Sequence, residues 1–229
     1  MRYAIYFVPE PDTDLALFGA AWLGRDIESG RALDRPAAPG FTSRQIDAIT
    51  AAPRRYGFHA TLKPPFHLRE GRAEDALLEA AERFALSQAA FVGPKPKLAA
   101  IGRFLALVPE EPCEAIDRLA GACVEHFDGF RRPASEQENA RRREANLTPR
   151  QDALLSRWGY PYVFDEFRFH MTLTAELDAA TRGRIAPVLE TMASPVLRVP
   201  LAFRSLTVVV EPEPGGAFML RRRYPLRSS

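Results

Sequence analysis

The sequence predicts an α+β fold: a bilobal, internally duplicated domain in which two mostly antiparallel sheets surround a central cleft, with helices outside. Two repeated motifs lead to this prediction. The motif His-x-Thr-Leu occurs at residues 59–62 and again at 170–173, each time within an apolar, strand-like run. Val-Pro-Glu occurs at residues 8–10 and 108–110, each time between a β-like run and an amphipathic helical pattern. Repetition of both motifs in the same order indicates a duplicated chain.

The duplication divides the 229 residues of one domain into pseudo-repeat halves of about 1–104 and 105–229. From each motif histidine to the next predicted hairpin turn is 44 residues, to Arg103 in the first half and to Pro214 in the second. The Val-Pro-Glu copies lie 100 residues apart and the motif histidines 111, so the second half has eleven extra residues before its histidine. The charged segment at about 131–150 is expected to hold them as a helical insertion.

Each half is expected to contain the same elements in the same order. A strand leads through Val-Pro-Glu, where proline suits the exit from a strand, into an amphipathic helix. The motif strand, a second helix and a hairpin follow. The second helices have apolar residues three or four positions apart, at Ala73, Leu77, Ala80, Ala81 and Phe84 in the first half and at Ile185, Val188, Leu189 and Met192 in the second. Pro187 is expected to kink or shorten the latter helix.

One further short helix is predicted directly after the insertion. Thr148 is a suitable N-cap, and Pro149 suits the first helical position. Gly159 is expected to end this helix.

The motif strands predict which side chains line the cleft. In a strand, residues i and i+2 point to the same face, so His59 and Thr61 project together, as do His170 and Thr172. The residues between them are apolar and are expected to face the core. The duplication then brings both pairs to one central cleft.

Two histidines and two threonines in one cleft suit in-line attack at a phosphodiester. Histidine titrates near neutrality, so one imidazole can remove a proton from water or a ribose hydroxyl while the other protonates the departing oxygen. Threonine hydroxyls can donate hydrogen bonds to the non-bridging phosphate oxygens. We therefore expect His59, Thr61, His170 and Thr172 to be catalytic, and we expect no metal or other cofactor.

Three basic residues near the motifs are candidates for substrate binding. Parity along the strands points Arg55, Lys63 and Arg168 to the histidine face. A guanidinium or ammonium group there would form charge-assisted hydrogen bonds with phosphate oxygens.

Other interpretations of the histidines are less favoured. A single His-x-Thr motif arises by chance and would indicate a core histidine, whereas two equivalent copies favour catalysis. A metal site would call for His-x-His or His-x-x-x-His spacing, which neither copy has, and Asp165 and Glu166 near His170 have no counterpart near His59. A serine nucleophile lacks the Gly-x-Ser-x-Gly motif.

Composition limits the class of protein. The net charge of +2 is too small for a general polyanion binder. No apolar run reaches the ~18 residues that span a bilayer, and no signal-peptide cleavage site follows the first strand, so no membrane partner is expected. Cys113 and Cys123 lie nearly three turns apart on one predicted helix and cannot bridge each other, which indicates a reduced, cytoplasmic protein.

With both motifs complete, the sequence resembles the 2H phosphoesterase superfamily, which is named for two His-x-Thr/Ser-hydrophobic motifs. The strings RRYGFHATLKPPF and LTPRQDALLSRWGYPYVFDEFRFHMTLT resemble one branch in particular, a bacterial family associated with phosphonate-utilisation genes. The resemblance covers nearly the whole chain. It implies a fold like that of RNA ligases and cyclic phosphodiesterases, and metal-independent action on cyclic phosphodiesters or 2′–5′ linkages. It also implies His59 and His170 as acid/base residues and Thr61 and Thr172 as phosphate ligands.

We therefore expect a phosphodiesterase that hydrolyses a small cyclic phosphodiester, either a cyclic nucleotide or, as the branch resemblance implies, a cyclic sugar phosphate of phosphonate metabolism. RNA end processing or 2′–5′ RNA ligation is the first alternative, although the low net charge argues against an RNA polymer. A non-catalytic sensor of nucleotides or phosphate esters is the second, although binding alone does not require two titrating groups. The choice of base and acid and the oligomeric state stay open at this stage.

Overall fold

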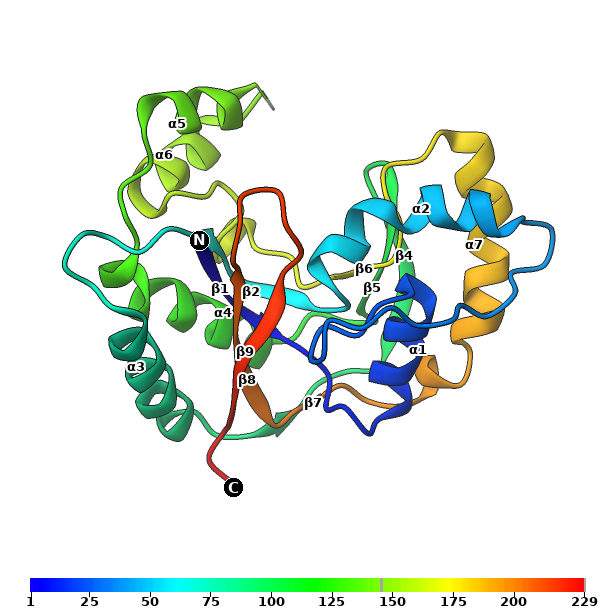
Figure 1. Ribbon diagram of the computed structural model, residues 1–229, viewed down its shortest axis with the longest axis horizontal. Coiled ribbons are helices and arrows are strands. Elements are labelled where there is room, and N and C mark those ends of the chain that lie inside the picture. Colours follow the sequence, from blue (N-terminus) through cyan, green and yellow to red (C-terminus); the bar gives the residue numbers. More distant parts are fainter. Residues whose placement is uncertain (145, 229) are drawn as a thin grey trace.

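The computed structural model describes residues 1–144 and 146–228, and it has the predicted α+β class (Figure 1). Its strands are β1 (Arg2–Phe7), β2 (Ala60–Phe66), β3 (Phe91–Val92), β4 (Pro96–Ile101), β5 (Phe104–Pro109), β6 (Met171–Thr172), β7 (Ala202–Phe203), β8 (Ser205–Glu211) and β9 (Met219–Pro225). Its α-helices are α1 (Asp14–Leu23), α2 (Ser43–Tyr56), α3 (Glu74–Ser87), α4 (Glu114–His126), α5 (Glu136–Arg143), α6 (Pro149–Trp158) and α7 (Ala179–Ala193). Three 3-10 helices are η1 (Asp128–Phe130), η2 (Phe164–Glu166) and η3 (Val196–Arg198).

The strands form one large sheet and one small sheet. Seven strands lie in the order β4-β5-β6-β2-β1-β8-β9, and β3 pairs with β7. Each of these strand pairs is antiparallel, as expected. The large sheet has two parts: β2-β1-β8-β9, which we call the β1 lobe, and β6-β5-β4, which we call the β5 lobe. They meet edge to edge where Ala60 pairs with Met171. The two motif strands are therefore direct neighbours.

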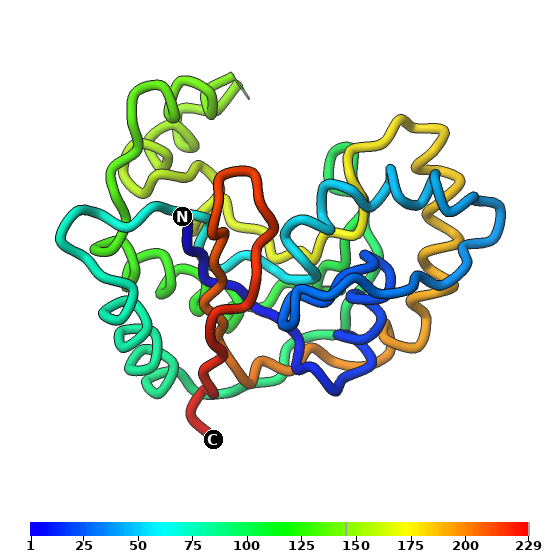
Figure 2. Tube along the Cα trace, viewed as in Figure 1, coloured from blue at the N-terminus to red at the C-terminus, as the bar shows by residue number. Residues whose placement is uncertain are grey.

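Each lobe takes strands from both halves of the sequence. Strand β5 lies almost wholly in the second half and pairs with β6 of the same half, but its other neighbour, β4, belongs to the first half. The β8–β9 hairpin ends the second half, yet β8 pairs with β1 in the first. Figure 2 shows this exchange, with the first strand running beside the red hairpin near the end of the chain. The proposed halves thus follow the sequence but not the lobes, while β1–β2 and β5–β6 occupy equivalent places, in keeping with the duplication we propose.

The helices follow the same division (Figure 1). Helix α4 packs on β2 and α3 packs on β8 and β9, whereas α7 packs on β4 and β5. Their apolar residues cover one face of the sheet, where Leu62 and Met171 are buried in the main core. The opposite face is thereby left for the site. No helix among the described residues is both long and apolar enough to cross a membrane.

The helix ends show how far local signals determine the fold. The Thr148 side chain accepts a hydrogen bond from the Gln151 backbone N–H, and α6 ends at Gly159 in the left-handed conformation, both as predicted. Within the predicted insertion, α5 forms a helix of eight residues. The expected interruption at Pro187 does not shorten α7, which continues to Ala193. The missing N–H there costs one hydrogen bond, while buried apolar residues hold the helix to the sheet.

Candidate active site

His59 and His170 are oriented by the same local contact. Nδ1 of His59 lies 2.9 Å from the carbonyl oxygen of Gly57, and Nδ1 of His170 lies 2.7 Å from that of Arg168. Because a carbonyl oxygen only accepts hydrogen bonds, Nδ1 carries the proton in each neutral ring. In both histidines Nε2 is therefore the nitrogen that can take up a proton at a substrate.

The register of β2 and β6 places the four motif side chains together. With Ala60 opposite Met171 in an antiparallel pair, His59 comes opposite Thr172 and Thr61 comes opposite His170. Directly opposed residues share a face, with Cβ atoms roughly 4.5–5.5 Å apart. Each histidine thus has the threonine of the other motif as its cross-strand neighbour.

The buried positions agree with this arrangement. Ala60 and Met171 are fully buried, and Leu62 and Leu173 are also in the core. The motif histidines and threonines are half-buried. The parity expected for the four side chains is thus the one observed, while their catalytic role remains a prediction.

His59 lies in the more enclosed environment. Its ring stacks on Tyr6 with centroids 3.7 Å apart and an interplanar angle of 21°. Its Nε2 lies 3.2 Å from Oγ1 of Thr61, whose hydroxyl can donate to it. Burial lowers the pKa of His59 to about 4, and the nearby His170 lowers it further, against the contact with Gly57, which raises it. The His59 imidazole is therefore neutral at pH 7.

The chain around His59 is fixed by its neighbour Phe58. The Phe58 ring is buried against α1, where a Cβ atom added to Gly19 would lie 2.0 Å from it. Only glycine at this position lets the ring approach so closely. The contact anchors the backbone directly before the histidine.

His170 is less constrained. Its nearest aromatic neighbour is Phe104, with ring centroids 5.7 Å apart and an angle of 44°. Among the described residues, no hydrogen bond is made to its Nε2. Burial lowers the pKa of His170, against the backbone contact with Arg168, which raises it.

Lys63 does not lie where parity placed it, and this prediction was wrong. The pairing of β1 with β2 shifts between Tyr6–Thr61 and Ile5–Lys63, which is a β-bulge. One extra residue reverses the face of the residues beyond it, so Lys63 enters the core. There its Nζ donates to the carbonyl oxygen of Val124 at 2.8 Å, and Asp128 lies 3.6 Å away.

Arg55 belongs to α2 instead of a strand, so the strand parity assigned to it was also wrong. Its Nε donates to the carbonyl oxygen of Gly216 at 2.8 Å, and its guanidinium forms an ion pair with Glu211. Its guanidinium also lies over the ring of Tyr56, 5.3 Å from the centroid. Arg55 thereby joins the end of α2 to the loop between β8 and β9.

Arg168 is exposed and lines a different hollow from the histidines. This pocket of about 350 Å³ also has Lys97 and Glu110 in its wall, and neither motif histidine lines it. A role for Arg168 in substrate binding remains a prediction.

Several residues near His59 carry no motif that the sequence analysis could have detected. Tyr6 faces His59 because it pairs with Thr61 across the sheet. Glu211, fully buried, accepts hydrogen bonds from Arg2 and from Arg55. The bond from Arg2 is the main cause that lowers the pKa of Glu211 to about 2. These residues come from separate elements, and only the fold brings them together.

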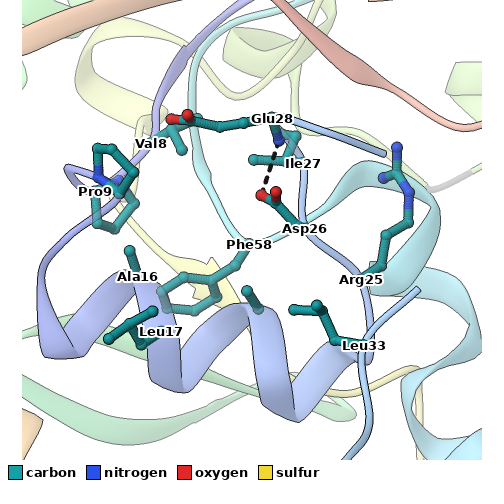
Figure 3. A pocket seen from close by; sticks show the side chains of 12 residues that line it. Val8, Pro9, Ala16, Leu17, Arg25, Asp26, Ile27, Glu28, Leu33 and Phe58 are labelled. Carbon is teal, nitrogen blue, oxygen red and sulfur yellow. Dashed lines mark hydrogen bonds between the residues drawn. The ribbon is translucent and has the colours of Figure 1, made fainter. Parts of the chain in front are cut away.

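An apolar pocket of about 240 Å³ lies beside the histidine face (Figure 3). Val8, which directly follows β1, and Phe58 line it together with Leu17 and Leu33. The last two are exposed large apolar side chains. The pocket thus extends from the neighbourhood of His59 toward α1.

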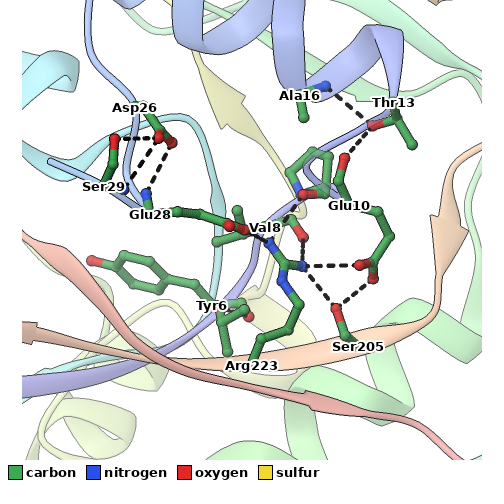
Figure 4. A network of polar contacts seen from close by, with 12 residues as sticks. Tyr6, Val8, Glu10, Thr13, Ala16, Asp26, Glu28, Ser29, Ser205 and Arg223 are labelled. Atoms are coloured by element: carbon green, nitrogen blue, oxygen red, sulfur yellow. Dashed lines mark hydrogen bonds and ion pairs between the residues drawn. The ribbon is translucent and has the colours of Figure 1, made fainter. Parts of the chain in front are cut away.

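The segment that follows β1 is fixed by Arg223 of β9 (Figure 4). The guanidinium donates to the carbonyl oxygens of Val8 and Pro9 at 2.8 and 3.2 Å and forms an ion pair with Glu28. Ser205 donates to Glu10 at 2.5 Å in the same network. The network holds the first Val-Pro-Glu segment and engages Arg223 in structural contacts.

The described part of the chain contains no group of three or more His, Cys, Asp or Glu residues that could hold a metal ion.

The family described as "Protein of unknown function (DUF1045)" matches residues 61–219, which include Thr61 and the whole second motif. The chain belongs to the DUF1045 family.

This DUF1045 chain is also similar to two curated proteins, each named "Ribose 1,5-bisphosphate phosphokinase PhnN". That of Janthinobacterium sp. (strain Marseille) is 42% identical over 228 residues, which cover 98% of this chain and 50% of the relative. That of Laribacter hongkongensis (strain HLHK9) is 36% identical over 222 residues, 97% of this chain and 51% of the relative. The chain spans about half the length of the curated relatives it matches.

Two solved structures resemble the fold distantly. One is E. coli LigT complexed with 3′-AMP, with a TM-score of 0.48 and 15% identity over 99% of this chain and 98% of that one. The other is TT0787 of Thermus thermophilus, with a TM-score of 0.46 and 15% identity over the full length of both chains.

Proposed function

We propose that this DUF1045 protein is a metal-independent phosphodiesterase that hydrolyses a small cyclic phosphodiester. The observation that carries the proposal is the pair of imidazoles on one face of adjacent strands, each with Nδ1 held by a carbonyl. Within residues 1–144 and 146–228, neither Nε2 has a carbonyl or carboxylate partner. A threonine hydroxyl lies across the strand from each histidine. This arrangement supplies a base, an acid and two phosphate ligands.

In the proposed reaction, one Nε2 removes a proton from a water molecule as its oxygen attacks phosphorus. The bond from phosphorus to one ring oxygen breaks, and the other Nε2–H protonates that oxygen. The product is a phosphate monoester with a free hydroxyl, and the two histidines exchange protons with solvent before the next turnover. Thr61 and Thr172 donate hydrogen bonds to the non-bridging oxygens, on which negative charge is concentrated.

The different environments favour His59 as the base and His170 as the acid. The base must be neutral, and burial holds the pKa of His59 at about 4. The acid must be protonated, and a bound phosphate anion raises the pKa of an adjacent imidazole. His170 is the less enclosed of the two, so the anion can more readily bring it to the imidazolium form.

The relatives and the motif resemblance support action on a sugar phosphate. Both relatives carry a name that refers to ribose bisphosphate, and the sequence strings resemble a family associated with phosphonate utilisation. We do not extend the kinase activity in that name to this chain. The phosphate-binding loop of P-loop kinases requires a Gly-Lys pair, and the sequence has none.

A panel of 2′,3′-cyclic nucleotides and cyclic sugar phosphates tests the proposal, with the monoester product measured in the presence and absence of EDTA. We expect turnover that survives chelation, because the residues supply proton transfer and phosphate contacts themselves. Loss of turnover on chelation, restored by one divalent metal, would contradict the metal-free mechanism. Binding of cyclic phosphates without turnover would favour a sensor instead.

A further inference from the structure

Two tyrosines lie beside His59, and a third, Tyr160, lies near them. Tyr6 of β1 stacks on the His59 ring, and the Tyr56 ring at the end of α2 lies 6.3 Å from it. Tyr160 follows α6, next to the predicted insertion. Burial raises the pKa of the Tyr6 phenol well above its usual range, and the phenols of Tyr56 and Tyr160 are close enough to raise it further. The phenols therefore occupy one small region.

The hydroxyl groups of these tyrosines are not engaged by other described residues. Within residues 1–144 and 146–228, no hydrogen bond joins the hydroxyl of Tyr6, Tyr56 or Tyr160 to another residue. The Tyr6 side chain is nevertheless only 1% exposed. Tyr56 and Tyr160 are half-buried. Hydroxyls that are not engaged within the protein can donate hydrogen bonds to a polar ligand.

A positive charge without a counterion lies next to them. Arg142 of α5 is half-buried and lies over the Tyr160 ring, 5.4 Å from its centroid, while its guanidinium donates to the carbonyl oxygen of Gly159. No carboxylate of the described residues forms an ion pair with it. Glu138, the nearest acidic influence on Arg142, pairs with Arg132 at 3.1 Å.

The surroundings add more positive charge. Arg2 and Arg55 share the single carboxylate of Glu211, so that group has an excess of one positive charge. Burial lowers the pKa of Arg142, and the positive charges of Arg131 and Arg2 lower it further, against Tyr160 and Glu138, which raise it. An anion placed between these groups would relieve the repulsion. The region next to the His59 ring therefore has the charge and the donors of an anion site.

We propose that Arg142, Tyr160 and Tyr6 form a subsite for a second anionic group of the substrate, a phosphate monoester. The inference rests on the proposed function, in which the phosphodiester lies at the two histidines. Several hydroxyl donors and a guanidinium match the three terminal oxygens of a monoester better than the two of a carboxylate. Because Arg142 belongs to the inserted helix α5, this insertion selects a small substrate that carries a terminal phosphate.

Two probes that differ by one phosphate test the subsite: adenosine 2′,3′-cyclic phosphate and the same compound with a 5′-phosphate. We expect the 5′-phosphorylated probe to have a kcat/KM and an affinity at least about tenfold higher, the size of effect that hydrogen bonds to a charged group give. Arg142→Gln should lower the kcat/KM and the affinity for the 5′-phosphorylated probe by about ten- to a hundredfold. The losses for the probe without a 5′-phosphate should be smaller.

Arg141→Gln is the matched control, because Arg141 lies on the same helix, carries the same charge and is exposed. It should leave the preference between the probes unchanged. Tyr160→Phe keeps the ring under Arg142 and removes only the hydroxyl, so it should lower the preference by a smaller factor. Circular dichroism of each variant checks that the fold is retained.

The outcomes separate this proposal from the proposed function. Turnover of both probes with equal kcat/KM, or equal losses in Arg142→Gln for both, would contradict the subsite and leave the hydrolase intact. A binding preference for the 5′-phosphorylated probe without turnover of either would support the subsite and contradict the hydrolase. Failure of both probes to bind would contradict both.

Discussion

The two copies of the His-x-Thr motif share one contact between the histidine ring and the backbone and have different surroundings. In each copy, Nδ1 of the histidine bonds to the carbonyl oxygen two residues earlier. The first copy leads into β2, a strand of seven residues between β1 and β6, whereas the second lies at β6, which has only two. His59 is enclosed by Tyr6 and contacts Thr61, while His170 has only the more distant Phe104 beside it.

The different roles that we propose for the two copies rest on this difference. The local contact sets which nitrogen faces the substrate, and it is identical in both copies. The packing around each ring sets its pKa, and it is not. A symmetric pair would have no preferred base, whereas the asymmetric burial gives His59 the stronger tendency to stay neutral.

Removal of either histidine should have the largest effect. His59→Ala and His170→Ala should each lower kcat by at least about 10²–10⁴-fold, the contribution typical of general acid–base catalysis. Because both groups serve one displacement, the double variant should be little worse than either single variant. Steady-state rates on a cyclic phosphate measure this. Near-normal turnover in either single variant would show that the pair does not act together.

Replacement of the threonines should have the next largest effect. Thr61→Val and Thr172→Val each remove one hydrogen bond to a charged group at nearly constant volume, worth about 1.5–3 kcal/mol, so kcat/KM should fall by about ten- to a hundredfold. Kinetics and phosphate binding of both variants measure it. Wild-type values in both would indicate that the threonines are structural.

The pH dependence should distinguish the roles of the two copies. Activity falls at low pH as the base becomes protonated, and Tyr6→Ala should admit water to His59 and raise its pKa from about 4 toward 6.5. The acidic limb of the pH–rate profile should then move to higher pH. Activity falls at high pH as the acid is deprotonated, and Phe104→Ala should raise the pKa of His170 and move the alkaline limb upward.

If Tyr6→Ala instead moved the alkaline limb and Phe104→Ala moved the acidic limb, His170 would be the base and His59 the acid. The apparent pKa values of the profile belong to the histidine pair, so the comparison uses shifts and not absolute values.

Lys63→Met should have the smallest effect on catalysis, with kcat/KM within about twofold of wild type, because Lys63 lies on the face away from the histidines. Its stability should differ from wild type in a pH-dependent way. Burial lowers the pKa of Lys63 to about 8 from 10.5, so between these values the unfolded chain binds more protons and stability rises with pH.

In the wild-type protein, the free energy of unfolding should rise between pH 8 and pH 10 by at most about 1.4 kcal/mol per pH unit from this group. Urea unfolding at the two pH values should show this rise in the wild type and not in Lys63→Met. A large rise in KM for the cyclic phosphate would instead return Lys63 to the substrate site.

The sequence predicted a feature correctly where that feature depends on neighbouring residues in the chain. Alternation along a strand predicts that His59 and Thr61 share a face, and the cap at Thr148 predicts the start of α6. It did not predict the orientation of a side chain where that orientation depends on how the chain pairs or continues elsewhere. The bulge that turns Lys63 inward appears only in the pairing of β2 with β1, and the helical position of Arg55 depends on α2 continuing past Pro53.

The residues beside His59 illustrate the same limit. Tyr6, Tyr160 and Arg142 share no motif, and Tyr6 lies more than a hundred positions from the other two, so nothing local relates it to them. Alternation along β1 could have indicated only that Tyr6 and Val8 share a face. The neighbours of His59 follow from the order of strands in the sheet, which the sequence repeats do not reveal.

The pairing of strands from both halves of the chain also has a consequence for folding during synthesis. Arg2 bonds to Glu211, 209 positions later, so β1 leaves the ribosome long before β8 is made. Contacts of such high sequence separation fold slowly, because the loop must close before they form. Neither half of the chain can complete a lobe by itself, and the two motif strands lie at the joint between the lobes. A newborn chain is therefore expected to stay inactive until the β8–β9 hairpin has been synthesised and β8 has paired with β1.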